Sequence, residues 1–143
     1  MLWAMKTTLF RISTGLLALA LVLGGVFDLL RAPAVTQTLA ALGYPAYLAS
    51  ILGFWKVLGA AAITAPGLAR LKEWAYAGVA FELTGAAASH AFAGDPPGKI
   101  LVPVVLLAFA ALSWALRPAS RRIGELFDAP VPAAATRAHA GMA

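Results

Sequence analysis

Cysteine is missing from this sequence of 143 residues, and charged residues make up only 12% of it. Without cysteine the chain can form no disulfide, no thiol redox centre and no thiolate metal site. Soluble domains carry roughly 25% charged residues, whereas this chain is 62% hydrophobic. The composition therefore excludes an ordinary water-soluble fold and indicates a membrane protein.

Acidic residues are also few, six against eleven lysines and arginines, which gives a formal net charge of +5. The basic residues lie at the ends of apolar runs, which is a topology signal and not the pattern of a nucleic-acid-binding surface. We therefore expect no nucleic-acid partner. Of the two histidines only His90 falls within an apolar run, so the chain lacks the ligands for a metal site, and haem ligation is disfavoured.

A helix needs ~20 apolar residues to cross a bilayer. Four apolar runs come close to this length, and they cover about residues 9–30, 47–65, 70–90 and 100–116. The last run carries Pro103 in its expected first turn, where proline is tolerated. A short head precedes the first run. The predicted fold is all-α, a polytopic four-transmembrane-helix bundle formed by one domain, residues 1–117.

The segments outside these runs have their own patterns. In residues 32–46, Val35, Leu39 and Leu42 have helical spacing, which predicts a short amphipathic helix in the membrane interface. A signal peptide is the alternative for the N-terminal run, because Lys6 precedes an apolar stretch and small residues follow it. Residues 118–143 are rich in Ala and Pro, so we expect a disordered basic cytoplasmic tail.

Basic residues are distributed unequally between the two ends of the four runs. Arg31 and Lys99 lie at one end, and eight basic residues lie at the opposite end: Lys6, Arg11, Arg70, Lys72, Arg117, Arg121, Arg122 and Arg137. The positive-inside rule then predicts that both termini and the 66–72 loop are cytoplasmic.

Two opposite charges lie near the middle of the second and third runs, Lys56 and Glu82. If these runs form an antiparallel hairpin, the two residues differ in depth by only ~3 Å. Charges at this depth normally face the protein interior and have partners. Each faces small residues that allow close helix packing, which are Ala49, Gly53, Gly59 and Ala60 beside Lys56, and Gly78, Gly85, Ala86 and Ser89 beside Glu82. We expect an ion pair here, which either only fixes the fold or forms a site for a ligand or a proton.

A second polar group is expected near the outer surface. The first run ends at Asp28 and Arg31, and the third ends at Ser89 and His90, so Asp28 would orient His90 or share its proton if those helices are neighbours. Glu73 lies on the face opposite Glu82, and as an acid in the first turn it would stabilise the helix N-terminus.

Four segments together resemble the DoxX-like family: GFWKVLG at 53–59, the pair Pro66-Gly67, LKEWAYAG at 71–78 and GAAASH at 85–90. The resemblance covers roughly residues 10–117 and implies a small four-span protein of the bacterial inner membrane. The family's motif positions fall on Lys56, Glu73, Trp74, Tyr76, Ser89 and His90.

The resemblance also implies a function. The family takes its name from a subunit of a thiosulfate:quinone oxidoreductase, so we expect a redox-associated subunit that binds a quinone or another hydrophobic small molecule within the bundle. Nothing in the sequence shows a thiosulfate site. The candidate ligand-binding residues are Asp28, Lys56, Tyr76, Glu82, Ser89 and His90, with Glu73 and Arg31 as structural charges.

Two other functions stay open. One is a non-catalytic assembly or interaction subunit, or a chaperone, that contacts a membrane protein partner or a second copy of itself as well as lipid. The other is a small membrane isomerase or hydrolase that uses Glu82 or His90 as acid or base. The sequence contains no nucleophile with a base at catalytic spacing, no phosphate-binding loop and no dinucleotide fingerprint, so it leaves open whether the protein is an enzyme.

Overall fold

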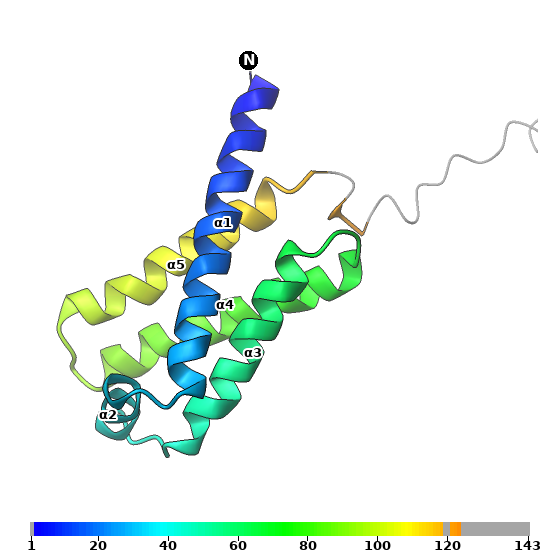
Figure 1. Ribbon diagram of the computed structural model, residues 1–143. Coiled ribbons are helices and arrows are strands. Elements are labelled where there is room, and N and C mark those ends of the chain that lie inside the picture. The colour runs from blue at the N-terminus through cyan, green and yellow to red at the C-terminus, as the bar shows by residue number, and fades with distance from the viewer. Residues whose placement is uncertain (1, 119–120, 124–143) are drawn as a thin grey trace, which may run out of the picture.

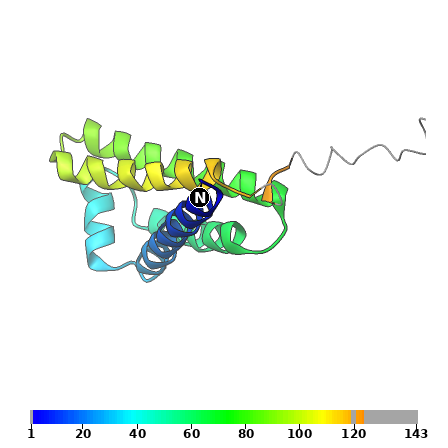
Figure 2. The same cartoon turned by 90° about the horizontal axis from the view of Figure 1, so that it is seen from above.

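The computed structural model describes residues 2–118 and 121–123, and in this part of the chain every regular element is an α-helix. The helices are α1 (Leu2–Leu29), α2 (Pro33–Ala41), α3 (Tyr47–Thr64), α4 (Ala69–Phe92) and α5 (Pro97–Ala115). α1 packs mainly against α3, and α4 mainly against α5. The two pairs form two layers, with α2 lying across one end of the bundle (Figures 1 and 2).

Three of the helices, α1, α3 and α5, are long and apolar enough to cross a membrane. They correspond to three of the four predicted runs, and the predicted helix between the first two runs is present as α2. The third run forms α4, whose mean hydropathy is lowered by the charged residues Arg70, Lys72, Glu73 and Glu82 and by His90. An apolar core fills the centre, formed chiefly by Leu17, Leu21, Ala60, Ile63, Tyr76, Val79, Leu83 and Ala110.

Two details of the predicted spans are wrong. Residues 2–8 belong to α1 and not to a separate head. Helix α5 begins at Pro97, where the missing N–H of a proline costs nothing, so Pro103 lies inside the helix instead of in its first turn. The expected disordered tail lies largely outside the described residues, which include only Pro118 and residues 121–123 of it.

Helices α1 and α3 approach each other closely at two glycines. A Cβ atom added to Gly53 would lie 2.7 Å from the carbonyl oxygen of Gly25, 2.8 Å from the amide of Leu29 and 2.9 Å from Cβ of Asp28. No larger residue fits at Gly53 without moving the α1 backbone. The glycine pair therefore brings the last turn of α1 directly against the middle of α3.

The C-terminal end of α3 is capped by a buried lysine from the next helix. The last carbonyls of a helix lack partners within it, and a positive charge near them is favourable. Lys72 of α4 is fully buried and donates hydrogen bonds to the carbonyl oxygens of Ala62 (2.7 Å), Ile63 (3.3 Å) and Ala65. This contact fixes the geometry of the α3–α4 turn.

Candidate functional site

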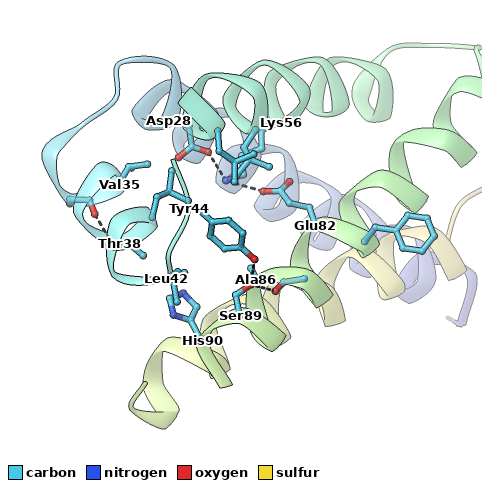
Figure 3. A pocket seen from close by; sticks show the side chains of 16 residues that line it. Asp28, Val35, Thr38, Leu42, Tyr44, Lys56, Glu82, Ala86, Ser89 and His90 are labelled. Atoms are coloured by element: carbon cyan, nitrogen blue, oxygen red, sulfur yellow. Dashed lines mark hydrogen bonds and ion pairs between the residues drawn. The ribbon is translucent and has the colours of Figure 1, made fainter. Parts of the chain in front are cut away.

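A cavity of about 580 Å³ lies between α2, α3 and α4, with the last turn of α1 at its edge (Figure 3). This volume is within the range of small-molecule sites. Aliphatic side chains form most of the α2 and α3 walls, and polar groups gather at two places, one at each side. The lining residues are Asp28, Ala34, Val35, Thr38, Leu39, Leu42, Tyr44, Leu48, Leu52, Lys56, Phe81, Glu82, Gly85, Ala86, Ser89 and His90.

The first polar group is an ion-pair triad, Asp28–Lys56–Glu82. The Nζ atom of Lys56 lies 2.7 Å from Oδ2 of Asp28 and 3.0 Å from Oε1 of Glu82. The side chains of Lys56 and Glu82 are each 20% exposed, and that of Asp28 is 9% exposed. The three groups are thus largely withdrawn from the surface but open to the cavity.

The triad exists because three helices meet at this point. The approach of α1 to Gly53 places Asp28 beside α3. Lys56 follows Gly53 by about one helical turn, so it lies on the face of α3 that contacts α1 and can reach Asp28. The short α3–α4 turn brings Glu82 to the same depth from the other side. A lysine in this position can satisfy carboxylates from both neighbours at once.

The charges of the triad do not balance. Two carboxylates share one ammonium, which has three N–H donors. Oδ2 of Asp28 and Oε1 of Glu82 account for the contacts of Lys56. Among the described residues, Oδ1 of Asp28 and Oε2 of Glu82 form no hydrogen bond, so both remain able to accept one from a bound molecule.

The second polar group joins the segment after α2 to α4. The hydroxyls of Tyr44 and Ser89 lie 2.9 Å apart, and Ser89 also donates to the carbonyl oxygen of Gly85 (2.8 Å). The Tyr44 ring crosses the cavity between the Lys56–Glu82 ion pair and Ser89 (Figure 3). This contact helps to hold the segment after α2 over the cavity.

His90 lines the same end of the cavity and has its own partners. Gly94 (φ 70°) ends α4 in the left-handed conformation, with Gly94 N–H bonded to Ala91 O and Asp95 N–H to His90 O, which is a Schellman motif. This turn brings Oδ2 of Asp95 to 2.7 Å from Nδ1 of His90, and Lys99 donates to Oδ1 at 2.8 Å. Hydrogen bonds from Lys99 and His90 lower the pKa of Asp95 below its usual value.

The predicted Lys56–Glu82 ion pair is confirmed. Close helix packing is also confirmed at Gly53, although the neighbour is α1 and not α4, and it is wrong at Gly78 and Gly85. Added Cβ atoms at Gly78 and Gly85 would meet nothing within 4 Å. These two glycines line cavities instead: Gly85 lines the one described above, and Gly78 lines a second cavity of about 440 Å³ nearer the α3–α4 turn, which shares Leu52 and Glu82 with the first.

The predicted contact between Asp28 and His90 is also wrong. Both residues line the cavity, but Asp28 binds Lys56 and His90 binds Asp95. The sequence offered a signal for Asp95, since it follows His90 by five residues across a glycine. It offered none for Tyr44, whose hydroxyl finds Ser89 only through the placement of α2.

The remaining predicted residues lie elsewhere. Tyr76 is buried in the core, where its hydroxyl lies 2.7 Å from Ser113 Oγ, which in turn lies 2.6 Å from Thr14 Oγ1. Arg31 donates from Nε to Ser50 Oγ at 3.0 Å, linking the end of α1 to α3.

Glu73 does not stabilise the N-terminus of α4, because it lies beyond the first helical turn. Its Oε1 atom is 2.8 Å from Nη2 of Arg117, and its Oε2 accepts a hydrogen bond from Trp114 Nε1 at 2.8 Å. Glu73 therefore joins α4 to the end of α5.

The site can hold a polar group among donors and acceptors while apolar walls enclose an attached chain. Within residues 2–118 and 121–123 no cluster of three or more His, Asp or Glu side chains could bind a metal ion.

A model of the DoxX-like family matches residues 12–113, a range that contains the whole triad and its surroundings. Neither the curated proteins nor the solved structures provide a match.

Proposed function

This chain belongs to the DoxX-like family, and on that premise we propose that it binds an amphipathic small molecule in the cavity between α2, α3 and α4. The single observation that carries the proposal is the position of the Asp28–Lys56–Glu82 triad at one side of an otherwise apolar cavity. The triad would hold the polar head, and the aliphatic wall formed by α2 and α3 would enclose the chain.

Three features support a binding site over a purely structural ion pair. The cavity is large enough for a ligand. Lys56 and Glu82 face it with about a fifth of their side chains exposed, whereas an ion pair that only held helices together would be better enclosed. Gly85 and Ala86 leave open space beside the carboxylate where larger residues would fill it.

The proposed setting is a four-span bundle in the bacterial inner membrane, with α4 as the fourth span. α4 has 24 residues, ~36 Å of helix, and short turns join it to α3 and α5. Because α4 packs along both α3 and α5, we propose that it crosses the membrane together with them. Its polar side chains Glu82 and Ser89 line the cavity, while Phe92, which does not line it, is 93% exposed.

The proposal extends to domains and orientation. We propose that residues 1–117 form the membrane domain and that both termini are cytoplasmic, because most basic residues lie at that end of the bundle. Residues 118–143 would then form a cytoplasmic tail.

Native mass spectrometry of the protein in mild detergent tests the binding function. We expect an added mass that is released on unfolding, and extraction of the released molecule into organic solvent would identify its class. A quinone, which the family resemblance implies, would be detected by its ultraviolet spectrum. A folded protein that repeatedly carries no molecule, even after incubation with a total lipid extract, would contradict the proposal.

A matched pair of variants on one helix locates the ligand. Gly85→Leu would fill the proposed cavity, and Gly78→Leu would fill the second cavity two helical turns earlier; both start from glycines with open space. We expect Gly85→Leu to lose the bound molecule and Gly78→Leu to keep it. Equal loss or equal retention would place the ligand elsewhere.

No contact among the described residues favours the assembly or isomerase and hydrolase alternatives.

A further inference from the structure

We infer that the molecule held in this cavity carries a cationic amine head, a statement that rests on the proposed binding function and narrows its ligand class. The triad offers two carboxylates to one ammonium. With its three groups ionised, it carries one negative charge more than it can neutralise. An uncompensated charge in an apolar setting is costly and is compensated by a proton or by a positive group.

The other titratable groups at the cavity do not supply that positive charge. His90 is bound to Asp95, and Asp95 is also bound to Lys99, so neither His90 nor Lys99 contacts the carboxylates of the triad. Arg31, the nearest arginine in sequence to Asp28, donates to Ser50 instead. Among the described residues no further cation contacts the triad, so a proton or a positive group on the bound molecule has to compensate the second carboxylate.

The free acceptor atoms match an ammonium group. Oδ1 of Asp28 and Oε2 of Glu82 have no hydrogen bond among the described residues, and an amine head can donate to carboxylate oxygens of this kind. Tyr44 lines the same cavity (Figure 3), and an aromatic ring near a bound cation adds to its attraction. Val35, Leu39 and Leu42 form the apolar wall for the attached chain.

Other head groups fit this charge pattern less well. A neutral carbonyl, as in a quinone, would use only the remaining N–H of Lys56 and would leave the excess charge in place. A carboxylate head would add a third negative charge to the triad, and repulsion between like charges opposes this. The order of preference is therefore amine, then neutral head, then carboxylate.

Three probes that share one chain test this order: dodecylamine, dodecanol and dodecanoate. The full-length protein is placed in nanodiscs of zwitterionic lipid, and each probe is added at the same mole fraction in the bilayer. The rise in melting temperature with probe concentration gives an apparent affinity. We expect dodecylamine to bind at least about tenfold more tightly than dodecanol, or ~1.4 kcal/mol, and dodecanoate to bind most weakly.

Glu82→Gln removes the excess charge and keeps the shape, so it should bring the affinities for amine and alcohol to within about twofold while dodecanol still binds. Asp28→Asn also removes one negative charge, from the other carboxylate, and it replaces Glu82→Gln in this test if Glu82→Gln does not fold. Gly85→Leu is the blank for non-specific effects, because it should remove the response to every probe.

Equal binding of dodecanol and dodecylamine to the parent would overturn the amine inference and leave the proposed function standing. An amine preference that is unchanged in both charge variants would also overturn it. Absence of any response in the folded parent, together with no co-purifying molecule, would overturn the proposed function itself.

Discussion

The Nζ atom of Lys56 lies 2.7 Å from Oδ2 of Asp28, although the two residues are 28 positions apart. The contact joins α3 to α1, while the longer one to Glu82 joins α3 to α4. The charged site is thus a property of three helices. A change in α1 should alter ligand binding by way of Lys56, even where the change does not touch α4.

This arrangement makes a specific prediction about stability. Breaking a buried ion pair from one side costs about 3–5 kcal/mol in soluble proteins, and less in membranes because unfolded helices also find partners. The double change Lys56→Leu with Glu82→Leu would still leave Asp28 without its ammonium. We expect the double variant to stay destabilised and the triple variant, with Asp28→Leu added, to regain much of the loss.

Thermal unfolding in detergent measures this series, with the single changes as references. Lys56→Leu should have the largest effect of the three singles, because it leaves two carboxylates unpaired. Glu82→Leu should have a smaller effect, since Lys56 keeps its shorter contact with Asp28. If the double variant already matches the parent, Asp28 contributes nothing to the site.

The close approach of α1 and α3 gives a second prediction. Gly53→Ala would place a methyl group 2.7 Å from Gly25 O and 2.9 Å from Asp28 Cβ, which forces the helices apart at a cost of about 1–3 kcal/mol. Gly78→Ala on α4 is the control, since its Cβ would meet open space. We expect a lower melting temperature only for Gly53→Ala; equal effects of the two changes would contradict the close approach.

The sequence predicted the helical fold and the Lys56–Glu82 pair because both depend on local information. Helix length and hydropathy locate the spans, and a short turn between two helices fixes which residues share a depth. The same reasoning named Asp28 as a site residue but could not pair it with Lys56, because the neighbour of α1 depends on the packing of Gly25 against Gly53 and not on any turn.

The wrong prediction for Asp28 and His90 has a related cause. Both residues lie near the C-terminal ends of helices expected to run in the same direction, but depth alone does not say which side chains meet. The Schellman turn after α4 places Asp95 close to His90. His90 therefore hydrogen-bonds to this neighbour in the sequence and not to Asp28 on another helix. Tyr76 lies in a motif but faces Ser113 in the core, because a motif position does not indicate the direction of a side chain.

Our third prediction concerns orientation in the membrane. Because basic residues collect at the end of the bundle that holds Arg70 and Arg117, a reporter fused at the C-terminus should give a cytoplasmic signal. A reporter inserted at Pro97, between α4 and α5, should give a periplasmic one. Fusion in the 66–68 turn is the matched control and should agree with the C-terminus. The same side at Pro97 and at the C-terminus would show that α5 does not cross.

The last prediction concerns the pH dependence of Asp95, in the turn between α4 and α5. Its pKa is lowered by hydrogen bonds from Lys99 and His90, so these contacts favour the folded state when Asp95 is ionised. Their contribution is complete above the ordinary aspartate pKa of ~3.9 and is lost as the pH falls through the lowered folded value. Lys99→Met should therefore raise the Asp95 pKa toward the ordinary value.

Carboxyl ¹³C chemical shifts of Asp95 measured against pH report this change directly. Lys6→Met, which removes an exposed lysine from the first turns of α1, should leave the Asp95 titration as it is in the parent. Asp95→Asn should lower the melting temperature slightly at neutral pH, and the difference from the parent should vanish in acid, where both side chains are neutral. An Asp95 titration that does not respond to Lys99→Met would show that Lys99 does not hold this carboxylate.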